Sequence, residues 1–171
     1  MDSLLEELKQ TLDSAVDGMS LEQISWHPAE KWSAGEILEH LYLTYTGTIK
    51  GFERVRDAGR PLVASASMRQ RLRKHVVLMF DYLPEGRKAP KTTVPRGLPT
   101  EKVRAEVGVK IAEMDEIIAQ CEARFGGSKL LDHPILGPLT ARQWRKFHWM
   151  HGRLHIRQIE RLRSQVRSGR R

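Results

Sequence analysis

Cysteine is almost absent from this sequence, since Cys121 is the only one among 171 residues. A single thiol excludes a disulfide within the chain and a zinc site built from cysteine ligands. Both absences fit a reducing compartment. Cys121 falls on the apolar stripe of a predicted helix, so we expect a buried, inert thiol rather than a nucleophile.

Long hydrophobic runs are also missing. No apolar stretch approaches the roughly 20 residues that a membrane-spanning helix needs. The N-terminal stretch MDSLLEELKQTLDSAV is acidic and amphipathic, and it lacks the basic start and apolar run of a signal peptide. We therefore expect a cytoplasmic protein with no membrane contact.

Acidic residues are in the minority, because 21 Asp and Glu stand against 29 Lys and Arg and leave a net charge of +8. The excess lies in residues 54–74, 87–96 and 157–171, and the last segment ends in a basic tail at about 164–171. One interpretation is a binding surface for nucleic acid or an acidic partner. No helix-turn-helix, RNP or zinc-finger pattern accompanies these charges. We therefore favour a solvated surface with a basic helix end, and we do not expect nucleic acid as a partner.

Apolar residues at helical spacing are the main signal that the sequence carries. They predict long helices at residues 4–16, 33–59, 100–125 and 140–166, and a shorter helix within residues 63–86. Ser33 with Glu36 and Thr140 with Gln143 form capping boxes that start two of these helices, and Thr100 is a candidate cap for a third. No strand is predicted.

The connections between these helices differ in length. The one after the second long helix is far longer than the others, and it holds the shorter helix and a basic, proline-containing loop at residues 87–99. This pattern favours an all-α fold, a four-helix bundle with a crossover. The length of the chain favours one domain over residues 1–171.

Three histidines within the stretch HWMHGRLHIRQ share one face of the last predicted helix. His151 and His155 are spaced i and i+4, so both can bind one ion, whereas His148 and His155 are about 10 Å apart along the axis. His40 on the second helix lies beside the apolar stripe and could supply a third ligand. The alternative is a polar helix face that binds nothing. His27, His75 and His133 look less like ligands, and His133 precedes a proline as loop residues often do.

Two stretches resemble a known family. KWSAGEILEHL, residues 31–41, is similar to the Trp-Ser…Glu…His-Leu signature of the DinB/YfiT-like superfamily, and HPILGPLTARQWRKFHWMHGRLHIRQI, residues 133–159, is similar to the C-terminal signature of its DinB-like subgroup. The resemblance covers residues 4–165.

This resemblance implies an up-down-down-up four-helix bundle and one divalent metal ion bound by His40, His151 and His155. His148 would be a neighbour that lines the pocket. Homodimers occur in that family, and its known enzymes use the metal with a low-molecular-weight thiol, as in bacillithiol transferases and mycothiol-dependent isomerases.

Three neutral imidazoles would leave open positions on the ion, which is the arrangement of a catalytic metal site. Imidazole suits several metals, and we expect zinc or nickel first, with iron and manganese as further candidates. Glu36 could orient His40, and Gln158 could contact a ligand or the substrate; the alternatives are a cap residue and a polar surface residue.

Four functions remain open at this point. We favour a thiol-dependent S-transferase that acts on electrophilic small molecules. A metal-dependent hydrolase that uses metal-bound hydroxide is the first alternative. A non-catalytic protein that binds through its basic surface is the second, and a bundle whose histidines bind nothing is the third.

Overall fold

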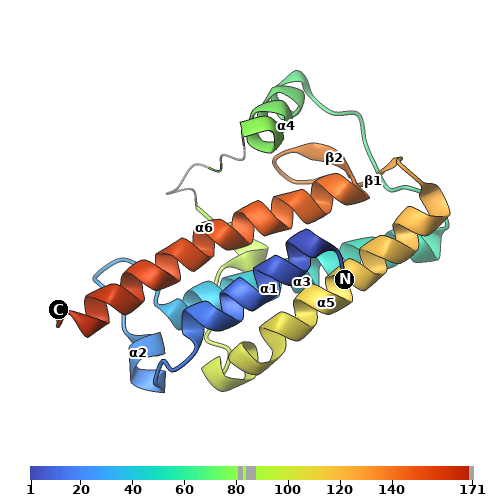
Figure 1. Ribbon diagram of the computed structural model, residues 1–171. Coiled ribbons are helices and arrows are strands. Elements are labelled where there is room, and N and C mark those ends of the chain that lie inside the picture. The colour runs from blue at the N-terminus through green and yellow to red at the C-terminus, as the bar shows by residue number, and fades with distance from the viewer. Residues whose placement is uncertain (81–82, 84–87, 170–171) are drawn as a thin grey trace.

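The protein is mostly helical, as the sequence predicts. A computed structural model describes residues 1–80, 83 and 88–169 (Figure 1). Within them the elements are α1 (Ser3–Val16), α2 (Leu21–Ser25), α3 (Ala34–Ala58), α4 (Met68–Phe80), the 3-10 helix η1 (Lys91–Thr93), α5 (Thr100–Phe125), β1 (Lys129–His133), β2 (Gly137–Thr140) and α6 (Ala141–Arg167).

Helix starts follow the predicted capping chemistry in two cases. The Ser33 hydroxyl accepts a hydrogen bond from the Glu36 N–H, and the Glu36 carboxylate accepts one from the Ser33 N–H, which satisfies two free amides at the start of α3. Thr140 and Gln143 do the same for α6. The candidate cap Thr100 is wrong by one position, because it is the first residue of α5 and Pro99 occupies the cap.

The long helices α1, α3, α5 and α6 run side by side, with α4 and the strands on one side of them (Figure 1). Helix α3 packs along α5, and α1 packs along α6. A Cβ at Gly152 of α6 would lie 2.2 Å from Cδ1 of Leu8, so α1 and α6 approach this closely only because the position is glycine. The predicted burial of Cys121 is confirmed, and burial raises the pKa of its thiol.

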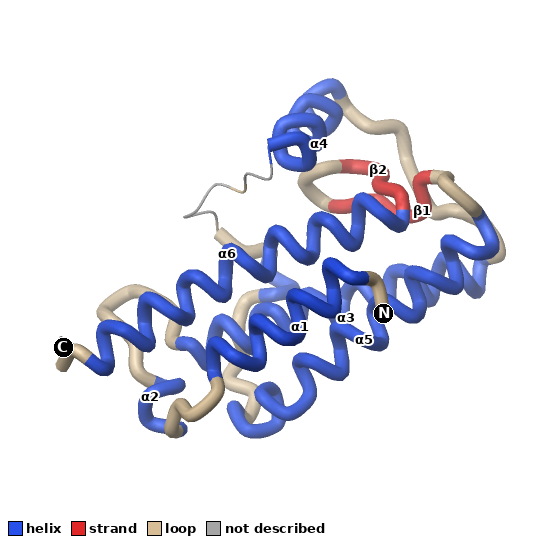
Figure 2. The backbone as a smooth tube through the Cα atoms, viewed as in Figure 1, coloured by secondary structure: helices blue, strands red, loops and turns tan. Residues whose placement is uncertain are grey.

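A two-stranded antiparallel hairpin corrects the all-α prediction. Strands β1 and β2 pair where the sequence predicts only a connector between two helices (Figure 2). Pro134 and Pro138 and the mix of Lys, Asp and His in this segment hide the alternation that marks a strand. The backbone holds the hairpin in place instead. Gly137, the first residue of β2, adopts a φ of 71°, which glycine allows, and the Leu62 N–H donates a hydrogen bond to the Leu130 carbonyl of β1.

Helix α4 carries an apolar stripe that does not face the core. Leu72, Val76 and Met79 are 67%, 40% and 63% exposed, whereas Val77 on the opposite side is buried. The sequence pattern therefore predicts the helix correctly, but it does not show which face of the helix packs against the rest of the protein. The sequence allows this helix to extend as far as residue 86, and residues 84–87 lie outside the described part of the chain.

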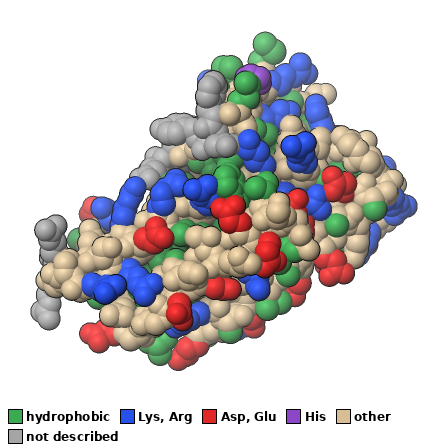
Figure 3. Space-filling view, viewed as in Figure 1, with side chains coloured by type: hydrophobic (Ala, Val, Ile, Leu, Met, Phe, Trp, Pro, Cys, Tyr) green, Lys and Arg blue, Asp and Glu red, His purple; other side chains and the backbone are tan. Residues whose placement is uncertain are grey.

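Charge on the visible surface has no single sign. On the face in Figure 3, lysine and arginine side chains occur in several places and are interleaved with aspartate and glutamate over the long helices. None of the helices in the described part of the chain is long and apolar enough to cross a membrane.

Candidate metal centre

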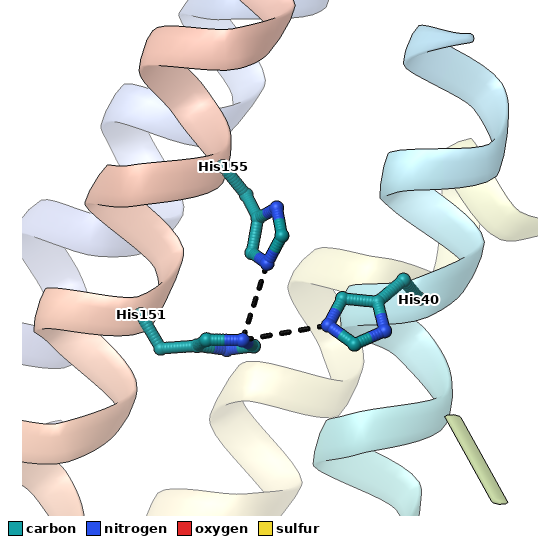
Figure 4. A group of neighbouring side chains, drawn as sticks. All are labelled: His40, His151 and His155. Carbon is teal, nitrogen blue, oxygen red and sulfur yellow. Dashed lines mark hydrogen bonds between the residues drawn. The ribbon is translucent and has the colours of Figure 1, made fainter. Parts of the chain in front are cut away.

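Helices α3 and α6 bring three histidine side chains to one point. His40 comes from α3, and His151 and His155 come from successive turns of α6 (Figure 4). The Nε2 atom of His151 lies 3.4 Å from Nε2 of His40 and 3.1 Å from Nε2 of His155. One nitrogen from each ring lies within 4.8 Å of the other two. The structure thus brings together the three residues that the sequence analysis selects.

Hydrogen bonds on the far side of two rings define where their protons are. His40 Nδ1–H donates to the main-chain carbonyl of Thr93 at 2.8 Å, and His155 Nδ1–H donates to Oε1 of Gln158 at 2.8 Å. A carbonyl oxygen can only accept, so both rings carry the proton on Nδ1 and present an unprotonated Nε2 to the centre of the cluster.

Two lone pairs then converge on His151. The Nε2 of His151 has one N–H at most, which could satisfy one of its two neighbours and not both. A cation at the centre would be coordinated by all three nitrogens. In a tetrahedral zinc site with Zn–N bonds of about 2.0–2.1 Å, ligand nitrogens stand about 3.4 Å apart, which matches the two short separations here. The donor set therefore fits a divalent ion.

Burial keeps the three rings neutral at ordinary pH. Desolvation lowers the pKa of His40, and the hydrogen bond to Thr93 partly opposes this shift. Desolvation, together with the charges of the neighbouring histidines, holds the pKa of His151 well below its usual range and lowers that of His155 to about 4. Because a metal ligand must be unprotonated, these shifts prepare the cluster for an ion at neutral pH.

A buried carboxylate that the sequence analysis overlooked supports His40. Glu39 accepts main-chain hydrogen bonds from Arg96 at 2.6 Å, Gly97 at 3.1 Å and Leu98 at 3.2 Å. These bonds attach the crossover loop to α3 next to His40 and so position the Thr93 carbonyl. A glutamate in mid-helix, adjacent to a core-facing histidine, is the one signal in the sequence that could have indicated this role.

Glu36 and Gln158 have different roles. Glu36 takes part in the capping box of α3, and the carbonyl of Thr93, not Glu36, accepts the hydrogen bond from His40 Nδ1–H. Of the two roles considered for Glu36, the structure therefore agrees with the helix cap. The Oε1 atom of Gln158 accepts a hydrogen bond from Nδ1–H of His155, and contact with a ligand is one of the two roles that the sequence analysis considers for it. It also lines the cavity described next.

A cavity of about 510 Å³ opens beside the three histidines, within the usual range for ligand pockets. Its walls are mostly apolar and come from α3, the hairpin, α6 and the loop around η1, and they include Trp32, Leu131, Ile135, Trp144, Phe147 and Leu154. Trp32 packs against His40, with ring centroids 5.2 Å apart, and Phe147 stacks on His151 at 5.5 Å. Aromatic rings therefore shield two of the three imidazoles from water.

His148 lies deeper in the same cavity and does not join the cluster. Its side chain is fully buried, with Trp144 stacked on the ring. The Thr48 hydroxyl donates to the Thr44 carbonyl at 3.1 Å, so its oxygen accepts from Nε2–H of His148, also at 3.1 Å. This agrees with the predicted place of His148 as a neighbour that lines the pocket.

The remaining histidines divide into two kinds. His27 and His75 are exposed and lie outside the cluster, and the sequence analysis favours neither as a ligand. His133 ends β1, is buried, and lines the cavity, although its sequence context suggests only a loop residue.

Comparisons with known proteins agree with the extent of this fold and name no reaction. The sequence profile of a family described as "Protein of unknown function (DUF1569)" matches residues 5–162. The chain is 26% identical to the uncharacterized protein YuaE of Bacillus subtilis (strain 168) over 177 aligned residues. The alignment covers 96% of this chain and 98% of YuaE. No solved structure shows a significant match.

Proposed function

We propose that this chain, which belongs to the DUF1569 family, is a metal-dependent enzyme that acts on a small molecule in the cavity beside its three histidines. The observation that carries the proposal is the convergence of the Nε2 atoms of His40, His151 and His155. The Nε2 atoms of His40 and His155 are unprotonated, because Nδ1–H of each ring donates a hydrogen bond to Thr93 or Gln158. A single N–H on His151 could donate to one of these two nitrogens and not to both.

The wider arrangement supports the resemblance to the DinB/YfiT-like superfamily. Four long helices lie side by side (Figure 1), and the long connection between α3 and α5 contains α4 and η1, with Ala89, Pro90 and Thr93 among the residues that line the cavity. We propose that these helices form the up-down-down-up four-helix bundle of that superfamily, with the hairpin as an addition that closes one side of the cavity. By the same resemblance, a homodimer is the proposed assembly.

The proposed reaction is the transfer of a low-molecular-weight thiol to an electrophilic small molecule. A divalent ion held by three neutral imidazoles supplies Lewis acidity, which generates a nucleophile from a thiol at neutral pH. The thiol would come from a cosubstrate, since Cys121 is buried against the carbonyl of Phe52 and does not line the cavity. Zinc and nickel are the proposed ions, followed by iron and manganese.

The residues of the chain have separate tasks in this scheme. His40, His151 and His155 hold the ion, and Thr93 and Gln158 hold two of the rings in the required tautomer. Trp32 and Phe147 pack on the ligands and exclude water from their faces. The apolar walls receive the body of the substrate.

The first experiment measures the metal content of untagged protein by mass spectrometry, for the wild type and for His151→Ala. We expect about one divalent ion per chain, lost in the variant. If the wild type binds no ion after incubation with zinc, nickel, iron and manganese in turn, the proposal is wrong.

The second experiment separates transfer from hydrolysis. The metal-loaded protein is supplied with monochlorobimane and with bacillithiol, mycothiol, glutathione or cysteine in turn. In transfer, a carbon–sulfur bond forms, chloride leaves with the bonding electrons, and the thiol proton passes to water. Fluorescence above the uncatalysed rate with one thiol supports transfer. Turnover of an ester panel without any thiol supports the hydrolase instead.

A variant in the cavity provides the matched control. Gly47 of α3 lines the cavity, and a Cβ at this position would meet no atom within 4 Å. Gly47→Leu should therefore fill the substrate space while the metal content stays near one ion per chain, and the helix should gain about 0.5–1 kcal/mol of stability. Unchanged turnover in this variant would place the reaction outside the cavity.

A further inference from the structure

The end of strand β1 presents a hydrogen-bond donor to the cavity. His133 is buried between two aromatic rings, with its centroid 5.3 Å from that of Trp144 and 4.2 Å from that of Phe147. Its ring lines the cavity beside the apolar side chains of Leu131, Pro134 and Ile135. A buried polar side chain in such a wall needs a partner for each of its ring nitrogens.

The hairpin turn determines the tautomer of this ring. His133 Nδ1 accepts hydrogen bonds from the main-chain N–H groups of Ile135 and Leu136, both at 3.2 Å. A nitrogen that accepts from an amide carries no proton, so the proton of the neutral ring is on Nε2. Burial lowers the pKa of His133 to about 4, and the ring therefore stays neutral at physiological pH.

The Nε2–H group of His133 has no hydrogen-bond partner among the residues that the structure describes, although His133 lines the cavity. Its position is rigid, because the turn and both aromatic neighbours hold the ring. A rigid donor of this kind can bind an oxygen acceptor at little cost in conformational entropy.

The distance to the metal centre limits what could bind there. Phe147 contacts both rings, with its centroid 4.2 Å from that of His133 and 5.5 Å from that of His151. The donor and the histidine cluster are therefore no further apart than one intervening aromatic ring would place them. A molecule that reaches both must have a spacer of about that size.

We propose that His133 Nε2–H binds an oxygen acceptor of the substrate, and that the substrate is a small molecule whose apolar, ring-sized spacer separates this acceptor from the group that reaches His40, His151 and His155. This rests on the proposed metal-dependent function. Two basic residues, Arg54 and Lys88, also line the cavity, whereas Asp132 is the one acidic residue in its described lining. The balance of charge favours a carboxylate as the acceptor.

Matched hydroxamates test the geometry. Benzohydroxamate, its 4-methyl derivative and its 4-carboxy derivative are titrated into zinc-loaded protein, with the fluorescence of the cavity residues Trp32 and Trp144 as the readout. We expect the 4-carboxy compound to bind about tenfold more tightly than the 4-methyl compound, the effect of one good hydrogen bond. Equal affinity of the two compounds for the wild type contradicts the proposal.

His133→Asn is the matched variant. The Asn side-chain oxygen can still accept from the amides two and three residues ahead, as in an Asx-turn, but the donor at Nε2 is lost. We expect a lower melting temperature, because Asn leaves space between Trp144 and Phe147, together with unchanged binding of the 4-methyl compound and no remaining preference for the carboxylate. A preference that persists in His133→Asn would assign it to Arg54 and Lys88 and overturn the role of His133.

A measurement without metal separates this proposal from the metal-dependent function. In metal-free protein labelled with [15N]histidine, NMR should show His133 protonated at Nε2 and not at Nδ1, and sodium benzoate should shift the Nε2 resonance. The opposite tautomer, or no shift with benzoate at saturating concentration, would refute the donor role even if the protein binds zinc. The expected shift in a protein that binds no metal would leave the donor in place and refute the proposed function alone.

Discussion

His40 is oriented by a residue 53 positions away, because its Nδ1–H donates to the main-chain carbonyl of Thr93 at 2.8 Å. The carbonyl belongs to η1, and Glu39 anchors the loop that follows through three main-chain bonds. A carboxylate outside the histidine cluster therefore helps to determine the geometry of the proposed metal site.

Glu39→Ala should weaken metal binding. The loop loses its three anchoring bonds, Thr93 moves, and His40 no longer presents Nε2 in a fixed direction. Loss of such an outer contact typically lowers metal affinity by about 10–100-fold. The measurement is a zinc competition titration against a chromophoric chelator.

Glu36→Ala is the control on the same helix. It removes a cap bond from Ser33, so the free energy of unfolding should fall by about 1 kcal/mol while zinc affinity stays within about twofold. A large loss of zinc affinity in Glu36→Ala, with none in Glu39→Ala, would restore the sequence-based hypothesis that Glu36 orients His40.

Gln158→Leu should weaken the metal site through His155. The Oε1 atom that accepts the Nδ1 proton disappears, and the ring can then rotate or change its tautomer. We expect about a tenfold or greater loss of zinc affinity, with little change in the melting temperature, since Gln158 is only half-buried. Gln158→Glu should keep the acceptor and most of the affinity, and equal losses in the two variants would contradict this role.

Arg145→Ala should destabilise the fold without touching the cavity. Arg145 is 8% exposed and bonds Asp115, which is 5% exposed, at 2.7 Å; it also pairs with Glu122. Removal of the guanidinium leaves a buried carboxylate without its cation, which costs about 3–5 kcal/mol. Urea denaturation measures the loss, and a loss below about 1 kcal/mol would show that water replaces the arginine.

Acid should destabilise the metal-free protein below pH 6.5. Burial lowers the pKa of His148 to about 3 and that of His133 to about 4, below the ordinary histidine pKa of about 6.5. In each case the unfolded chain binds a proton at a higher pH than the folded chain. Stability is therefore complete above pH 6.5 and falls as the pH drops toward the folded values, by up to about 1.4 kcal/mol per pH unit for each ring.

His148→Gln isolates one of these protons. The Gln amide can still donate to the Thr48 hydroxyl, and it does not titrate. Between pH 6 and pH 4, the free energy of unfolding of the variant should fall less steeply than that of the wild type, by about 1.4 kcal/mol per pH unit. Parallel curves would mean that His148 is not a buried neutral ring.

Local patterns were sufficient to predict the helices and part of the site. Ser33 with Glu36 and Thr140 with Gln143 predict two helix starts because a capping box depends only on residues three apart. His151 and His155 predict a shared point because i and i+4 side chains meet on any helix. His40 needs one further assumption, that the apolar stripe beside it faces the core, and its burial agrees with this.

Contacts between distant segments decided the rest. The sequence by itself determined where the four long helices run and which histidines share a face, since those properties depend on neighbours within one or two turns. It did not predict the short helices α2 and η1. Only the tertiary structure decided that Thr93 and Glu39 stand behind His40, that Leu72 and Met79 face outward, and that His133 is buried in the cavity wall. Each of these depends on which surfaces bury one another, and burial is a property of the whole packed chain.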